Sequence, residues 1–176
     1  ALGWLIDTYV IAGYACAWNI GANNHISPNN LSFGGEIYSA GLAIRLIKDD
    51  SSDPGTVTDK DGNVYNTVKI GDQVWMASNL IVTHYNDGTA ITNVTGASAW
   101  AALTSEAYCA YDNDESNAFE YASDIAPTGS HVPTKDELDL LVTYLGGSAV
   151  AGGKLKELGF LHWNPPNTDA DNSSGF

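Results

Sequence analysis

The feature that most restricts the fold is one well-marked helix in a chain that otherwise consists of short strand-like runs. Pro133 precedes Thr134, and Thr134 and Glu137 have the T-x-x-E spacing of a capping box, in which side chains satisfy unpaired backbone N–H groups at a helix start. Gly146-Gly147 tolerates positive φ and is typical of a helix end. Between them, apolar residues recur at i, i+3, i+4 and i+7: Leu138, Leu141, Val142 and Leu145. The pattern predicts a helix from Thr134 with one buried face.

Most of the remaining chain has the pattern of short strands separated by turns. Runs rich in Trp, Tyr, Val and Ile cover residues 3–10, 13–20, 42–47 and 74–76. Asp61-Gly62 is a hairpin signal between two β-prone runs, and 86–89 is a further turn. Short helices are expected at 98–103 and 153–158. This mixture predicts an α+β fold with one or two helices beside the short strands.

Composition narrows the classes of function. The chain has 176 residues, of which 44% are hydrophobic and 16% charged, so it is long enough to form a core. Its formal net charge of -14 argues against nucleic-acid binding, which needs a basic surface. The acidity favours a soluble surface, and a cation, a cationic partner or a neutral glycan stays open. No apolar run is long enough for a membrane span. The apolar start lacks a basic region and contains Asp7, so it is not an intact signal peptide.

Several motifs carry a resemblance to a known family. They are VTDKDGNVYNTVKIGDQVWMASNL, THYNDGT, AYCAYDNDESN, APTGSHVPTKDEL, YLGGSAVAGGKLKELG and HWNPPNTDADNSSGF. Together they resemble the Fibrobacter succinogenes major paralogous domain, a family of secreted and surface proteins of bacteria. The fold of this family is similar to the C-type-lectin-like fold of formylglycine-generating enzymes. The resemblance implies a C-type-lectin-like α+β fold and a secreted or cell-surface location. Ala126 and Ser130 stand where the family usually has Cys and Trp.

The order of the segments departs from that of the family. Residues 57–176 resemble the beginning and middle of such a domain, 1–49 resemble its C-terminal strands, and 50–56 form a linker that overlaps the polar run KDDSSDPG at 48–55. Three arrangements fit: a circular permutant, a slice of a tandem array, and a fibre subunit whose first residues complete a neighbour. Exposed strand edges would promote the association that the last two need. Tandem domains are common in the family, which favours these two, with copies of the chain or adjacent domains as partners.

No catalytic constellation is apparent. The sequence lacks G-x-S-x-G, a P-loop and G-x-G-x-x-G. The four histidines, none of which has metal-ligand spacing to another, are His25, His84, His131 and His162. His131 is expected to be structural, since it precedes the capped helix. We therefore expect a protein that is not an enzyme.

Two acidic clusters are weak candidates for calcium. The first has the D-x-D-x-N pattern in which oxygen ligands alternate with spacers: Asp59, Asp61 and Asn63. The second comprises Asp112, Asp114 and Glu115. The first lacks the distal Glu of an EF-hand and is better explained by an Asx-rich hairpin turn, and the second is better explained by a solvated turn. We expect no cofactor, with calcium as the weaker alternative.

Aromatic and amide side chains near the start provide the other candidate site. Aromatic rings stack on sugars, and Asn offers both donors and acceptors. The candidate ligand-binding residues are Trp4, Tyr14, Trp18, Asn19, Asn23 and Asn24. Packing in the core is the competing explanation for Trp4 and Trp18, and it is also the expectation for Trp75, Trp100 and Trp163.

Two cysteines are present. Cys16 and Cys109 are a disulfide candidate in an oxidising compartment, and two buried thiols are the alternative.

Two functional hypotheses follow. The first is a non-enzymatic extracellular assembly module, a repeating subunit of a bacterial surface fibre or array that neighbouring chains complete by strand exchange. The second is a C-type-lectin-like adhesion module that binds a glycan or a surface protein.

Overall fold

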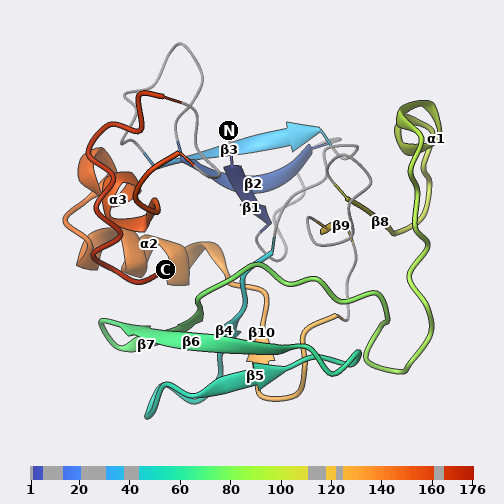
Figure 1. Ribbon diagram of the computed structural model, residues 1–176, viewed down its shortest axis with the longest axis horizontal. Helices are drawn as coiled ribbons and strands as arrows, with labels where there is room; N and C mark the ends of the chain where they lie inside the picture. The colour runs from blue at the N-terminus through green and yellow to red at the C-terminus, as the bar shows by residue number, and fades with distance from the viewer. Residues whose placement is uncertain are drawn as a thin grey trace.

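The structure is a computed structural model that describes residues 2–5, 14–20, 31–37, 44–110, 118–121, 125–160 and 165–176 (Figure 1). Side chains are described for 44–109, 125–160 and 165–176. The helices are α1 (Ala97–Ala101), α2 (Lys135–Tyr144) and α3 (Ser148–Leu155). They accompany antiparallel strands, so the prediction of an α+β fold is confirmed at this level.

The central sheet has five strands in the order β10-β4-β7-β6-β5, and every neighbouring pair is antiparallel. These strands are β4 (Ile47–Lys48), β5 (Thr56–Thr58), β6 (Val64–Ile70), β7 (Gln73–Met76) and β10 (Ser130–His131). The predicted turn at Asp61-Gly62 lies between β5 and β6, where Gly62 has φ +86°. The predicted strand at 74–76 is part of β7.

Two smaller sheets complete the strand content. One has the order β1-β2-β3 and consists of β1 (Leu2–Leu5), β2 (Tyr14–Ile20) and β3 (Leu31–Ile37). The other is the pair β8 (Ala107–Ala110) and β9 (Ala118–Tyr121). In Figure 1 the sheet of β1 to β3 lies on the side of the molecule opposite β5 and β6, and α3 contacts β3.

The segment before the linker is part of the interior. Ile47 belongs to the core cluster that includes Trp75 of β7 and Leu141 of α2. Ile44 and Leu46 belong to a second cluster, which includes Met76 of β7. All three are 3% exposed or less. The strand expected at 42–47 is therefore shorter in the structure: β4 covers Ile47–Lys48, and residues 44–46 before it are extended into the core without being part of a strand.

The sequence predicted α2 closely and α3 less well. Thr134 caps α2 and forms both arms of the capping box with Glu137, as expected. α3 begins at Ser148, five residues before the predicted start at Gly153. The glycines at 152 and 153 disfavour a helix locally. At Gly153 a Cβ would lie 2.5 Å from the backbone O of Asp169, so only glycine allows this close packing.

The tryptophan predictions had different outcomes. Trp75 is 1% exposed and is packed edge-on against Phe176, as expected for a core residue. Trp100 is only partly buried, since it lies on the short helix α1, which has no buried residue. Trp163 lies outside the described residues.

Candidate functional site

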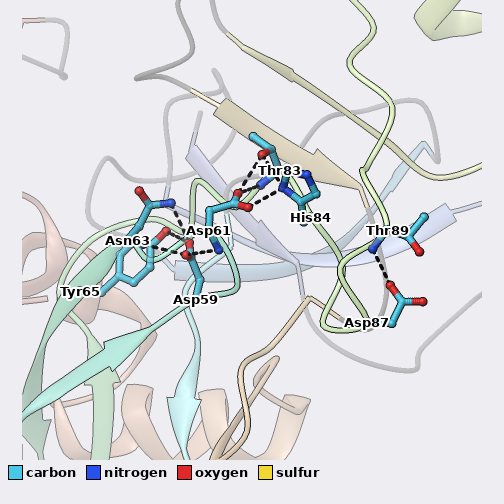
Figure 2. Close-up of polar contacts among 8 residues, drawn as sticks. All are labelled: Asp59, Asp61, Asn63, Tyr65, Thr83, His84, Asp87 and Thr89. Atoms are coloured by element: carbon cyan, nitrogen blue, oxygen red, sulfur yellow. Dashed lines mark hydrogen bonds and ion pairs between the residues drawn. The ribbon is translucent and has the colours of Figure 1, made fainter.

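A network of hydrogen bonds joins the β5–β6 hairpin to the loop after β7 (Figure 2). We call this group the hairpin–loop network; its members are Asp59, Asp61, Asn63, Tyr65, Thr83 and His84. Asp59 is its buried hub. Its Oδ1 accepts from the backbone N of Asp61 (3.0 Å) and of Asn63 (2.9 Å). Its Oδ2 accepts from Asn63 Nδ2 (2.9 Å) and from the Tyr65 hydroxyl (2.5 Å).

Asp61 makes the connection to the loop. Its Oδ2 accepts from the backbone N and the hydroxyl of Thr83, and its Oδ1 lies 2.5 Å from His84 Nδ1. Its side chain is 18% exposed. Burial raises the pKa of Asp61, but the hydrogen bonds from Thr83 and His84 outweigh it and hold the pKa below its usual value. Asp61 is therefore ionised and bridges two segments that are 22 residues apart in sequence.

The geometry of this network favours a structural role. A carboxylate has about four acceptor positions, and Asp59 uses four for hydrogen bonds within the chain. His84 approaches both Asp61 and Thr83 (3.1 Å) with the same nitrogen, Nδ1. A nucleophile–base–acid relay needs the two ring nitrogens to face different partners, so these three residues do not form one. Within the described ranges, no three His, Cys, Asp or Glu side chains are grouped as metal ligands.

The predicted turn at 86–89 continues this loop. The backbone N of Thr89 donates to Asp87 Oδ1 (2.8 Å), and Gly88 has φ +91° (Figure 2). Tyr85 directly precedes this turn, and burial together with a hydrogen bond to Glu106 raises the pKa of Tyr85 to about 12. The side chain of Asp87 thus closes the turn.

A second cluster holds the end of β4. We call it the β4 clasp; its residues are Asp49, His131 and Glu137. His131 Nδ1 lies 2.6 Å from Asp49 Oδ1, and His131 Nε2 lies 2.9 Å from Glu137 Oε1. The backbone N of Asp49 donates to the O of Gly129 (3.0 Å). His131 thus connects the start of the linker to the first turn of α2, as its expected structural role implies.

Arg45 holds the other end of the same segment. Its Nε donates to Asn79 Oδ1 (2.9 Å), and its guanidinium lies 4.6 Å from the centre of the Phe176 ring. Burial lowers the pKa of Arg45 to about 10, while Glu157 acts in the opposite direction. Arg45 therefore ties residues before the linker to the far end of the chain.

The remaining predicted site residues are described only in part. Trp4 lies in β1, and Tyr14, Trp18 and Asn19 lie in β2; only their backbones are described. The residues outside the described part are Asn23, Asn24, His25, Asp112, Asp114, Glu115 and His162. Cys109 is a free, partly buried thiol in this structure, and burial raises its pKa. The side chain of Cys16 is not described, so the pairing of the two cysteines stays a prediction.

The sequence reasoning missed the partners of these clusters. Thr83 and His84 gave no signal, because they meet Asp61 across 22 and 23 residues. Asp49 was assigned to the end of the terminal-strand segment, and nothing in its surroundings indicated His131, 82 residues away. The T-x-x-E motif did locate Glu137, but as a cap only.

Comparisons with known proteins identify the family. A model of the Fibrobacter succinogenes major domain matches residues 68–176, more than half of the chain. No curated protein and no solved structure matches the chain. None of the helices in the described part is long and apolar enough to cross a membrane. The chain belongs to the Fibrobacter succinogenes major domain family.

Proposed function

We propose that this chain is a non-enzymatic assembly module at a bacterial surface, with a C-type-lectin-like domain whose parts occur in permuted order. In an array or fibre of such modules, β4 of one copy completes the sheet of the next. The partners are copies of the chain or adjacent domains. The hairpin–loop network and the β4 clasp support the non-enzymatic part of this proposal, because their polar side chains pair with one another.

The position of β4 is the observation that carries the proposal. β4 precedes the residues that match the family, yet it lies between β7 and β10 of that part. The backbone N of Met76 donates to the O of Leu46 (2.9 Å), and that of Leu80 to the O of Ile44 (2.8 Å). A body without this segment would leave these donors and a deep apolar seat uncovered. Such an unpaired strand edge can pair with a strand of its own chain or with a strand of a neighbouring copy.

The linker permits either source of the strand. Residues 51–55 are exposed, and residues 49–55 connect β4 to β5. β4 and β5 are three strand spacings apart in the sheet, about 14 Å. The linker reaches about 25 Å when extended. Closure within one chain therefore requires no strain, and we expect exchange between chains to depend on concentration.

A disulfide trap distinguishes the two sources. Lys48 and Ser130 are opposite each other in the β4–β10 pair, a position at which two cysteines can bond. The test chain carries Lys48→Cys and Ser130→Cys in a background of Cys16→Ser and Cys109→Ser. It is oxidised at a series of concentrations and analysed on non-reducing gels and by light scattering.

The proposal predicts disulfide-linked ladders that increase with protein concentration. Each single-cysteine variant serves as a control, since it gives at most a dimer. A monomer that closes its disulfide internally at every concentration would refute strand exchange and leave a permuted, self-contained domain.

A glycan- or protein-binding module is the second candidate. The register of β1 to β3 favours it, because Trp4 is opposite Trp18, and Trp18 is opposite Phe33. An aromatic row of this kind suits stacking on a sugar. A glycan array probed with and without calcium, with Trp18→Ala as the comparison, tests this candidate. An absence of hits under both conditions would count against it.

A further inference from the structure

The β4 clasp places one histidine between two carboxylates at the point where β4 meets the linker. A neutral imidazole has one donor nitrogen and one acceptor nitrogen, whereas an imidazolium has two donors. Both neighbours of His131 are carboxylate oxygens, at 2.6 and 2.9 Å. When both carboxylates are ionised, only the protonated ring can donate to both, so the geometry favours the charged form.

We propose that protonated His131 fastens β4 in its seat and that β4 loosens when this histidine loses its proton. The release of β4 would regulate strand exchange by pH, and this consequence rests on the proposed function. Mild acid keeps β4 in place, and a higher pH makes it available to a neighbouring copy.

The other charged groups nearby are already engaged. On β4, Lys48 Nζ donates to the O of Asp53 (3.0 Å). On the first turn of α2, Lys135 pairs with Asp139, and Asp136 acts on the same lysine. The carboxylates of Asp49 and Glu137 are the ones that face His131.

The direction of the pH effect follows from the pKa shifts. Burial lowers the pKa of His131, but the two carboxylates outweigh it and raise the pKa above its usual value. A raised pKa in the folded state gives stability that is fully present below the unfolded pKa and is lost as the pH rises through the folded one. Burial raises the pKa of Glu137, while Thr134 and His131 lower it, with a net decrease. The clasp is therefore strongest between about pH 4.5 and about pH 6.5, the ordinary values of the two groups.

Hydrogen exchange measures the loosening directly. The backbone amides of Met76 and Leu80 donate to carbonyls of the segment before the linker, so their protection reports whether that segment is seated. The full chain is measured at about pH 5.5 and about pH 8.5, on either side of the histidine titration, with correction for intrinsic exchange. We expect protection at these amides to decrease by about threefold or more at the higher pH.

Three variants make the test specific. His131→Gln removes the charge and should abolish the pH dependence, leaving the weaker protection at both pH values. Asp49→Asn keeps Glu137 as a partner and should remove part of the dependence. His84→Gln removes the aspartate-paired histidine of the hairpin–loop network and should leave the dependence intact. Retention of the full dependence by His131→Gln, or its absence from the unmodified chain, would overturn the proposal.

Light scattering on the same samples separates this inference from the proposed function. A chain that opens at high pH but stays monomeric would refute strand exchange and retain the clasp. A chain that assembles without any dependence on His131 would refute the clasp and retain the exchange.

Discussion

Replacing Leu46, the residue just before β4, with alanine tests whether the segment before the linker is part of the cooperative core of the domain. Leu46 is 0% exposed and lies in the core cluster that includes Met76, Leu80 and Ile125. The substitution deletes three carbon atoms, which is a loss of about 2.4 kcal/mol at 0.8 kcal/mol for each buried methylene-sized group. A residual cavity increases the cost, so we expect the free energy of unfolding to decrease by about 3 kcal/mol.

Urea denaturation followed by circular dichroism and by tryptophan fluorescence measures this loss. With a denaturant dependence of about 2 kcal/mol per molar urea, the midpoint should shift by about 1.5 M. Leu158→Ala is the matched control, because Leu158 is 69% exposed and the same atoms are deleted. We expect the control to change stability by less than about 0.5 kcal/mol.

The comparison of the midpoint shifts of the two variants can refute this reasoning. If Leu46→Ala shifts the midpoint no more than Leu158→Ala, the segment before the linker is not part of the cooperative unit. The segment that contains β4 would then be only weakly associated with the rest of the domain. The assembly proposal would lose its main support. Coincident transitions with both probes are needed, since the free energies assume two-state unfolding.

Three further predictions concern the polar and glycine positions. Asp59→Asn puts an amide donor where Oδ2 accepts two hydrogen bonds, and it should lower the free energy of unfolding by about 1–3 kcal/mol in urea titrations; no change would contradict the hub role. Gly153→Ala should lower the melting temperature, because the clash with the O of Asp169 outweighs the better helix propensity, and a gain would contradict this packing. Stability should decrease as the pH falls below about 4, since Asp61 and Glu137 have lowered pKa values in the folded state, and a flat melting temperature from pH 6 to about 3 would contradict it.

Local signals predicted the elements that depend on a few adjacent residues. The capping box, the apolar face and the terminal glycines of α2 lie within 14 residues of one another, and the helix begins and ends as they indicated. The turn at Asp61-Gly62 is a similar case. The start of α3 was misplaced, because Gly152 and Gly153 disfavour a helix locally, whereas the helix in the structure includes both of them.

The two polar clusters depend on contacts that no spacing in the sequence indicates. The D-x-D-x-N pattern located Asp59 and Asp61 and suggested calcium as the weaker of two alternatives. It did not indicate Thr83 or His84, which engage Asp61. The same acceptor-rich residue types serve a cation loop and an Asx turn, and only the placement of the donors distinguishes them.

The position of β4 bears on both the stability of the domain and the proposed assembly. Apolar side chains of residues 44–47, which lead into β4, contribute to both core clusters, whereas Arg45 and the β4 clasp make the polar contacts at the two ends of this segment. The burial of apolar side chains is the same whether the strand comes from its own chain or from a copy. This burial therefore determines how tightly the strand binds in the sheet, but not which chain supplies it. The clasp holds the histidine whose pKa the two carboxylates raise. Under the proposed switch, the chain keeps a strongly buried strand and adjusts how readily that strand is released, because the clasp lies at the exposed end of the strand.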